Sequence, residues 1–259
     1  MNILMSFYQV IYGIINFMNQ VSILLKKGGD KALAESFSNK TGSPILNSEG
    51  PELTVVFDSK GVSLTGYKLS YQGDFDGMVR RVTEGRLLHE MLYKATKTDK
   101  TGLKAIDATA GMGEDAFLIA ANGYDVTLHE QNPVIALLLK DAIRRAKKQP
   151  VLKDIVTRMH VVEGDSVEIL SNRLDPVDLI YLDPMFPGRQ KSGLINKKLQ
   201  LIQKMESPCS EEAALFDAAI KAGPSKIVVK RPLKAPFLAG YKPNYSLDGK
   251  AIRYDCYTY

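Results

Sequence analysis

The sequence predicts an α/β fold in which a mostly parallel, Rossmann-like sheet ends in an antiparallel hairpin and follows a small N-terminal α+β lobe. From about residue 104, short apolar strands alternate with helical patterns, which is typical of a parallel sheet with helices on both faces. A glycine turn joins the first of these strands to its helix. Near the C-terminus, two strand-like runs flank Asp248-Gly249-Lys250, which indicates a hairpin.

Composition supports one globular chain in a reducing compartment. The 259 residues are 45% hydrophobic and 24% charged, which excludes collagenous and disordered classes. A net charge of +5 favours a polyanionic partner without requiring one. The cysteines, Cys209 and Cys256, are too few for a disulfide framework and lack the spacing of a zinc site. We therefore expect a cytoplasmic protein without a metal.

The N-terminus is uncharged as far as Leu25, so a membrane or signal segment has to be weighed. Polar residues interrupt the run every few positions, and no Lys or Arg precedes it. We expect no membrane association, and interpret residues 1–17 as an extension that is non-native or disordered. Residues 18–77 are the predicted lobe, and residues 78–259 the larger domain.

The individual elements follow from local patterns. In the lobe we predict a strand at 21–25, a helix at 30–38, a hairpin at 53–57 and 62–65, and an irregular boundary at 70–77. One helix is expected over 81–95. The larger domain then carries strands at 105–108, 126–128, 159–162, 177–182 and 226–230, helices at 114–121, 133–147, 166–170 and 210–222, and hairpin strands at 245–247 and 252–257.

The glycine turn, residues 107–116 (DATAGMGEDA), is the first candidate binding site. Gly111 and Gly113 let the backbone approach a ligand at a helix N-terminus. Asp107, Glu114 and Asp115 would repel the pyrophosphate of a dinucleotide, so a cationic ligand fits better. S-adenosylmethionine carries a sulfonium and an ammonium group. The alternative is that Glu114 and Asp115 are simply favourable acids in a helix first turn.

Polar residues at the next two strand ends extend this site. Glu130 ends the second strand, where an acid bridges two ribose hydroxyls. Asp165 and Ser166 follow the third strand and are placed to meet the adenine edge. The sequence therefore predicts a class I S-adenosylmethionine-dependent methyltransferase sheet, although a solvated surface remains the alternative for Glu130 alone.

The fourth strand is followed by Asp183-Pro184-Met185-Phe186. This run resembles the Asp/Asn-Pro-Pro-aromatic motif of methyltransferases that act on exocyclic amino nitrogens. Such a nitrogen is a poor nucleophile until its N–H groups are polarised. Asp183 offers a carboxylate, Pro184 a backbone carbonyl and Phe186 a stacking face. The alternative is a strand-end turn with two prolines.

Basic residues near the same sheet edge are candidate phosphate contacts. They are Arg80, Arg81, Arg86, Arg189, Lys191, Lys230 and Arg231. The cluster at 144–148 lies on a helix away from that edge and is interpreted as a solvated face.

Taken together, these motifs resemble the ribosomal RNA small-subunit methyltransferase J family, which are bacterial guanine-N2 methyltransferases. The matching segments are 107–115, 130–133, 181–187 with 190–192, 228–232 and 253–257. The resemblance implies S-adenosylmethionine as cofactor and the 16S ribosomal RNA or 30S subunit as partner. It also implies that the cofactor site includes Glu114, Asp115, Glu130, Gln131, Asp165, Ser166 and Asp183.

This chain departs from the family pattern at two positions. Glu114 stands where the family has Arg, and Gln131 follows Glu130 where Arg is expected. Two alternatives stay open: an amino methyltransferase acting on adenine or on a protein glutamine, and a catalytically silent RNA-binding module.

Overall fold

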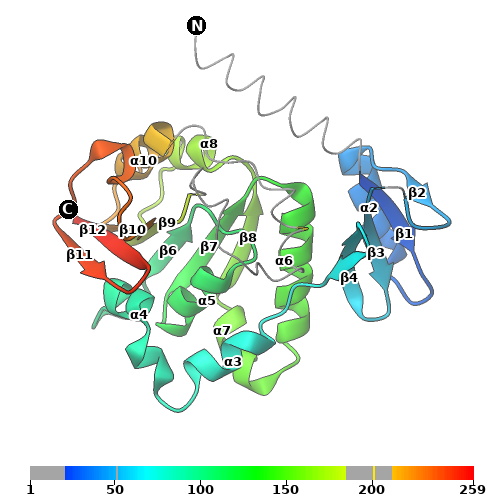
Figure 1. The fold of residues 1–259 in the computed structure, drawn as a ribbon, viewed down its shortest axis with the longest axis horizontal. Coiled ribbons are helices and arrows are strands. Elements are labelled where there is room, and N and C mark those ends of the chain that lie inside the picture. Colours follow the sequence, from blue (N-terminus) through cyan, green and yellow to red (C-terminus); the bar gives the residue numbers. More distant parts are fainter. Residues whose placement is uncertain (1–20, 51, 185–200, 202–211) are drawn as a thin grey trace, which may run out of the picture. The chain divides into compact units, whose positions relative to one another are not determined.

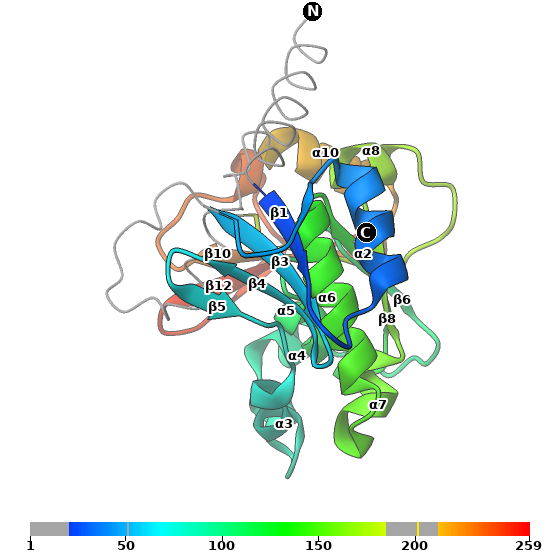
Figure 2. The same cartoon turned by 90° about the vertical axis from the view of Figure 1, so that its right-hand side faces the viewer.

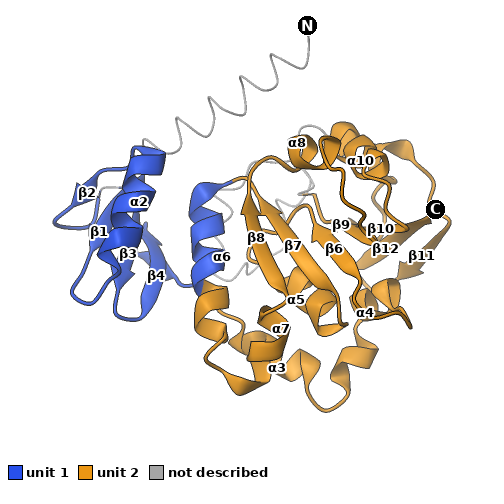
Figure 3. Cartoon of the chain, turned by 180° about the vertical axis from the view of Figure 1, so that it is seen from behind, with its two compact units in different colours: residues 1–73, 132–141, 192–207 blue, residues 74–131, 142–191, 208–259 orange. Residues whose placement is uncertain are grey.

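The computed structural model describes residues 21–50, 52–184, 201 and 212–259. The chain forms two compact units, coloured separately in Figure 3. The first comprises residues 1–73, 132–141 and 192–207, and the second residues 74–131, 142–191 and 208–259. The N-terminal segment of the first unit thus ends within the 70–77 region where the sequence predicts a domain boundary. The other two segments of this unit, 132–141 and 192–207, belong to the larger domain in the sequence interpretation.

The first unit is built on a five-stranded sheet. Its strand order is β2 (Ile45–Leu46), β1 (Val21–Leu25), β3 (Leu53–Asp58), β4 (Gly61–Gly66) and β5 (Leu69–Tyr71). Strand β1 runs parallel to β2 and β3, and the remaining pairs are antiparallel. Helix α2 (Lys31–Thr41) packs against β1, and Figure 2 shows β1, β3 and β4 side by side. The predicted strand, helix and hairpin are confirmed.

Strands β2 and β5 were not predicted. Strand β5 falls partly in the segment expected to be irregular, because that expectation rested on the Gly and Asp residues at 72–77. The turn before β5 has no glycine at its two central positions. Tyr67 and Lys68 both adopt the left-handed conformation there, with φ of 52° and 62°. Such non-glycine residues do not identify a tight turn in the sequence.

The second unit is built on a seven-stranded sheet (Figure 1). Its order is β11 (Tyr245–Asp248), β12 (Ile252–Thr258), β10 (Lys226–Pro232), β9 (Leu179–Leu182), β6 (Lys104–Asp107), β7 (Asp125–Glu130) and β8 (Met159–Glu163). From β10 to β8 the strands are parallel, whereas β12 runs antiparallel to both β10 and β11. The predicted Rossmann-like sheet with a closing hairpin is confirmed.

The order of the strands places a topological switch point between β6 and β9, because the chain builds outward to β7 and β8 before crossing to β9. Ligands of open α/β sheets bind at the carboxyl ends of strands at such a point. The glycine turn follows β6, and Asp183 follows β9.

In the described residues after β5, the helices are α3 (Asp76–Val82), α4 (Met91–Thr96), α5 (Glu114–Ala121), α6 (Pro133–Ala146), α7 (Pro150–Val156), α8 (Ser166–Ser171) and α10 (Glu212–Lys221), with 3-10 turns at η1 (Arg86–His89) and η2 (Leu238–Gly240). The division between the two units falls within α6. On one sheet face, Ile106, Ile180 and Val229 join a core with residues of α8 and α10. Side chains alternate along strands, so Asp107, Tyr181 and Lys230 point to the opposite face, where α5 lies.

The single helix expected over 81–95 is wrong. Helix α3 ends at Val82, a 3-10 turn follows, and α4 begins only at Met91. Glu84 and Gly85 are left-handed, with φ of 55° and 72°, which a continuous α-helix does not allow. Helix α7, which begins with proline at its N-terminus, was not predicted. None of the helices in the described ranges is long and apolar enough to cross a membrane.

Candidate active site

The glycine turn after β6 has the geometry that the sequence predicts. Gly111 and Gly113 have φ of 51° and 77°, a region that favours glycine. The N–H of Gly113 donates to the carbonyl of Ala110 at 2.8 Å, which closes the turn. The turn leads directly into α5, so the N-terminus of that helix faces the carboxyl edge of the sheet.

Glu130, at the end of β7, lies next to this turn. Its Oε2 accepts a hydrogen bond from the N–H of Gly111 at 3.0 Å. Gln131 follows as an exposed residue. Asp165 accepts from the N–H of Val167 at 2.7 Å and caps α8, while the hydroxyl of Ser166 donates to the carbonyl of Ala108 at 2.6 Å. Glu130, Asp165 and Ser166, predicted from the strand ends, and Gln131, implied by the family resemblance, therefore lie at this carboxyl edge.

Asp107 is the buried acid of the site, with 1% exposure. Its Oδ1 accepts a hydrogen bond from the N–H of Thr109 at 3.0 Å. Burial, together with the nearby carboxylates of Asp115 and Asp183, raises the pKa of Asp107 to about 8, and the Thr109 hydrogen bond and the charge of Lys230 oppose this shift. Near neutral pH, much of this carboxyl group is therefore protonated.

Asp183 is held through its backbone and its side chain. Its N–H donates to the hydroxyl of Thr109 at 2.7 Å, which ties the end of β9 to the glycine turn. Its Oδ2 lies 2.9 Å from the ammonium of Lys230. Pro184 is buried directly after it, whereas Phe186 lies outside the described residues. The structure thus brings the predicted cofactor turn and the predicted catalytic acid together.

The charges of this site suit a cationic ligand. Asp115 and Asp183 lie close enough to Asp107 to raise its pKa beyond the effect of burial, and Glu114 stands exposed in the first turn of α5. Lys230 directly contacts both Asp115 and Asp183. The sulfonium and ammonium groups of S-adenosylmethionine fit this acidic set, and the N–H groups of the turn suit its carboxylate. Among the described residues, no group of three or more His, Cys, Asp or Glu side chains could hold a metal ion.

The seven predicted RNA contacts divide into four groups. Arg80 and Arg86 are exposed, and Arg86 lies 3.3 Å from Glu84. Arg81 makes two hydrogen bonds to Glu90, at 2.7 and 2.8 Å. Arg189 and Lys191 lie outside the described residues.

The remaining two predicted contacts face inward. Lys230 is 17% exposed and paired with two acids. Arg231 is 1% exposed, and its guanidinium contacts Glu212 at 2.9 Å and the carbonyl of Pro236 at 3.2 Å. The prediction that Arg231 contacts phosphate is therefore corrected, because a buried, ion-paired guanidinium is not offered to a polyanion. The alternation of β10 places Arg231 on the same face as Ile227 and Val229 of the apolar core. A charged residue is not expected on that face, so the pattern alone does not predict its burial.

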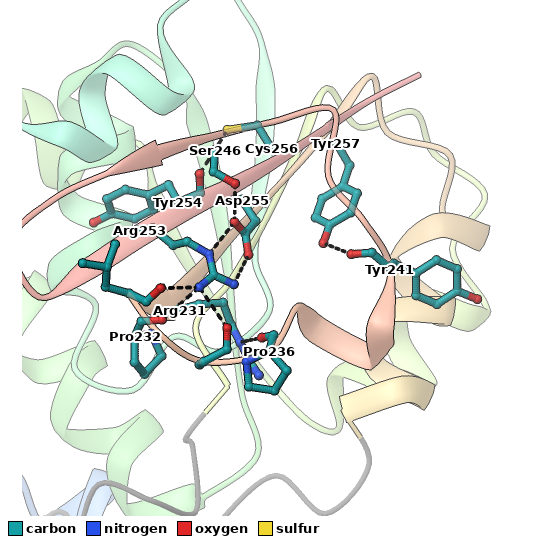
Figure 4. A network of polar contacts seen from close by, with 12 residues as sticks. Arg231, Pro232, Pro236, Tyr241, Ser246, Arg253, Tyr254, Asp255, Cys256 and Tyr257 are labelled. Atoms are coloured by element: carbon teal, nitrogen blue, oxygen red, sulfur yellow. Dashed lines mark hydrogen bonds and ion pairs between the residues drawn. The ribbon is translucent and has the colours of Figure 1, made fainter.

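Arg253 lies at the centre of a polar network beside the site, a structural role that the sequence did not predict (Figure 4). Its Nε and Nη2 meet the two oxygens of Asp255 at 2.8 and 3.0 Å. Its Nη1 donates to the carbonyls of Pro232, Leu233 and Ala235 at 3.2, 2.7 and 2.9 Å. One guanidinium thereby holds the loop that follows β10 at the carboxyl edge of the sheet.

Tyr181 and Thr109 are the other contributors that were missed. The hydroxyl of Tyr181 donates to Asp115 Oδ2 at 2.6 Å, and Thr109 bonds to both Asp107 and Asp183. Tyr181 lies on β9 two positions before Asp183 and shares the sheet face of Asp107. A period-two pattern applied to this strand is the signal that finds it.

The fold and the site define a class I S-adenosylmethionine-dependent methyltransferase. A family model described as "Putative SAM-dependent methyltransferase" matches residues 63–259. A crystal structure of an S-adenosylmethionine-dependent methyltransferase from Neisseria gonorrhoeae superposes with a TM-score of 0.70 and 27% identity, covering 92% of this chain and 95% of that one.

Curated relatives narrow the family further. A protein named ribosomal RNA small subunit methyltransferase J from Pseudomonas savastanoi is 37% identical over 238 residues, which is 86% of each chain. The protein of that name from Pseudomonas aeruginosa strain LESB58 is 35% identical over 86% of this chain and 89% of its own. The chain belongs to the ribosomal RNA small subunit methyltransferase J family and is an enzyme that uses S-adenosylmethionine.

Proposed function

We propose that this enzyme transfers a methyl group from S-adenosylmethionine to the N2 amino group of a guanine in small-subunit ribosomal RNA, with Asp183 as the catalytic acceptor. The observation that carries this proposal is the position of Asp183. It follows β9 at the switch point, and its backbone is bonded to Thr109 of the cofactor turn. A carboxylate is thus fixed beside the place where the methyl donor binds.

The residues of the chain supply the polarisation that this reaction needs. Bound S-adenosylmethionine supplies an electrophilic methyl group on a sulfonium. The N2 lone pair of guanine is delocalised into the ring, so the carboxylate of Asp183 raises its electron density by accepting a hydrogen bond from N–H. The new bond forms between the methyl carbon and N2, and the electron pair of the broken bond stays on sulfur.

The reaction leaves a proton on the methylated nitrogen. The carboxylate of Asp183 takes this proton and passes it to water, which returns the site to its starting charge. The positive charge on N2 grows as the bond forms, so the hydrogen bond to Asp183 is strongest in the transition state. General-base assistance of this kind contributes about 10²–10⁴-fold in rate.

Cofactor binding is assigned to the three strand ends. The turn with Gly111 and Gly113 takes the carboxylate, and Glu114 and Asp115 take the cationic groups, with the buried carboxyl of Asp107 beside them as a hydrogen-bonding group. Glu130 takes the ribose hydroxyls, with Gln131 beside it. Asp165 and Ser166 lie next to the adenine edge. Hydrogen bonds to charged groups contribute about 1.5–3 kcal/mol each.

RNA binding is assigned to exposed arginines and to the segment after β9. Arg80 and Arg86 are exposed in the second unit, which supports phosphate binding. Arg81, Arg189 and Lys191 complete the proposed phosphate contacts. Pro184 and Phe186 would hold the extruded base, Phe186 by stacking. A ribosomal substrate also implies a cytoplasmic enzyme.

Methylation of ribosomal RNA tests the proposal directly. Small subunits and free 16S RNA from a strain lacking the gene are incubated with the protein and labelled S-adenosylmethionine, and the nucleosides are separated by mass spectrometry. We expect N2-methylguanosine at one site. Label on an adenine amino group, on a cytosine carbon or on a protein glutamine would contradict the assignment, and the absence of transfer would favour a silent RNA-binding module.

A further inference from the structure

Lys230 connects the cofactor turn to the catalytic acid. Its ammonium lies 2.6 Å from Asp115 Oδ2 on α5 and 2.9 Å from Asp183 Oδ2 after β9. The three side chains are 17%, 19% and 26% exposed, so solvent screens these contacts only partly. Asp115 Oδ2 also accepts from the hydroxyl of Tyr181 at 2.6 Å. Four side chains from α5, β9 and β10 thus form one polar cluster.

Lys230 is a permanent cation in this cluster. Burial disfavours the ammonium, but Asp115 and Asp183 outweigh that effect and raise the pKa of Lys230 above its usual range. A lysine that already contacts two carboxylates has little capacity left for a phosphate. Its chemistry therefore belongs to the reaction site and not to the RNA backbone.

The groups around Asp183 make that cation necessary. Asp115 and Asp183 are like charges that face the same space, and together with burial they raise the pKa of Asp107. Burial raises the pKa of Tyr254, on β12, well above its usual range. Asp115 and Asp183 add to this effect, and Lys230 and Arg81 oppose it. Burial likewise raises the pKa of Tyr181 well above its usual range. Among these neighbours, Lys230 is the cation in direct contact with Asp183.

We propose that Lys230 is a positioning residue for methyl transfer: by binding Asp183 and Asp115 at once, it orients the Asp183 carboxylate and keeps it ionised. This inference rests on the role of Asp183 in the proposed function. One carboxylate oxygen is engaged by the ammonium and the backbone N–H is engaged by Thr109, so the remaining rotation of the side chain is restricted.

The test compares Lys230→Gln, which removes the charge, with Lys230→Arg, which keeps it. Single-turnover methylation is measured at saturating cofactor across pH 5–9. For Lys230→Gln we expect a rate loss of about 10²-fold. We also expect the acid limb of the pH–rate profile, where the rate falls as Asp183 is protonated, to move upward by about one to three pH units, the usual effect of losing an opposite charge at this distance. Lys230→Arg should keep an acid limb near that of the wild type and recover part of the rate.

RNA affinity provides the readout that separates positioning from phosphate binding. Loss of a phosphate contact lowers affinity and reduces the salt dependence of binding by about one charge. We expect Lys230→Gln to bind RNA within twofold of the wild type. Lys221→Gln, on the exposed end of α10, is the matched control and should change neither the rate nor the acid limb.

An unchanged acid limb in Lys230→Gln, or an equal displacement in Lys230→Arg, would overturn the proposal. Weaker RNA binding with an unchanged rate would assign Lys230 to phosphate. Asp115→Asn supplies a second measurement if Lys230→Gln fails to fold: removing that like charge should lower the acid limb or leave it in place, and a rise would overturn the proposal. Failure of this proposal can be distinguished from failure of the proposed function. The proposed function is rejected only if the wild-type enzyme gives a wrong methylated product or none.

Discussion

The N–H of Gly111 donates a hydrogen bond to Glu130 Oε2 at 3.0 Å, so the end of β7 supports the glycine turn after β6. Under the proposed function, this contact gives Glu130 two effects on the cofactor site. It carries the carboxylate proposed for the ribose, and it holds the backbone that is proposed to meet the rest of the cofactor. The two effects can be separated by substitution.

Replacing Glu130 by Ala should weaken S-adenosylhomocysteine binding by about 1.5–3 kcal/mol, which is the range for a hydrogen bond to a charged group. Glu130→Gln keeps an acceptor for Gly111 and should lose less. Titration calorimetry measures both variants. Glu163, paired with Glu130 in the β7–β8 register, is the matched control, and its Ala variant should bind as the wild type does. Equal losses at the two positions would argue against a specific role for Glu130.

Asp183→Asn should lower single-turnover methylation by about 10²–10³-fold while RNA affinity stays within a few fold of the wild type. The amide keeps the shape but supplies a neutral acceptor, so the interaction that is lost is the one that strengthens as N2 becomes positive. Rates and RNA binding are measured on the same preparations. Equal rates in the two proteins would remove Asp183 from the mechanism.

Arg253→Met should destabilise the second unit by about 3–5 kcal/mol, because it leaves the fully buried carboxylate of Asp255 without its cation. The loop carbonyls of Leu233 and Ala235 lose their donor as well. Urea unfolding measures the loss. Arg253→Met combined with Asp255→Asn should recover part of it, since no unpaired charge remains. A single variant as stable as the wild type would show that the network contributes little.

The features predicted from sequence are those with local causes. The residues between Asp107 and Asp115 combine a strand end, two glycines and a helix start, so one short segment specifies the turn. Alternation of strands and helices identifies the parallel sheet, and its strand ends identify Glu130 and Asp183. Each of these inferences needs only neighbouring residues.

The features that were missed depend on partners distant in the sequence. Lys230 and Arg231 are adjacent, yet one turns to the α5 face and the other to the face where Glu212 lies. From sequence alone, two adjacent basic residues predict phosphate binding. The structure shows that acidic side chains already contact both of them. The break at Glu84 in the expected 81–95 helix likewise involves a non-glycine residue in the left-handed conformation, which helical periodicity does not reveal.

Acidification should destabilise the protein through His129, which is 2% exposed. Burial, assisted by the charge of Arg173, lowers the pKa of His129 to about 4. The unfolded chain takes up the proton near pH 6.5, whereas the folded chain stays neutral, so stability is lost as pH falls from about 6.5 to 4, by up to about 3 kcal/mol. Urea unfolding of His129→Gln should show a smaller loss than the wild type over this range. His89→Gln, at an exposed site, should behave as the wild type does.

Asp107 should act in the opposite direction at higher pH. Its pKa is raised to about 8 by burial and then by Asp115 and Asp183. The unfolded carboxyl loses its proton near pH 4 while the folded one retains it, so this group's contribution to stability is complete below pH 4 and is lost as pH rises to about 8. The difference in unfolding free energy between Asp107→Asn and the wild type should therefore shift in favour of the variant between pH 5 and pH 9.

Groups that titrate alike in the variant and the wild type cancel when their unfolding free energies are subtracted at each pH. The change of this difference with pH therefore reports on Asp107. Asp99→Asn, at an exposed position, is the control, and its difference from the wild type should stay flat across the same range. The absolute stability of Asp107→Asn carries no weight in this test, because an amide in the place of the carboxyl changes the hydrogen bond with Thr109 at every pH. A flat difference for Asp107→Asn would mean that this carboxyl is already ionised in the folded protein at pH 5. Burial and the neighbouring carboxylates would then not raise the pKa of Asp107 to about 8.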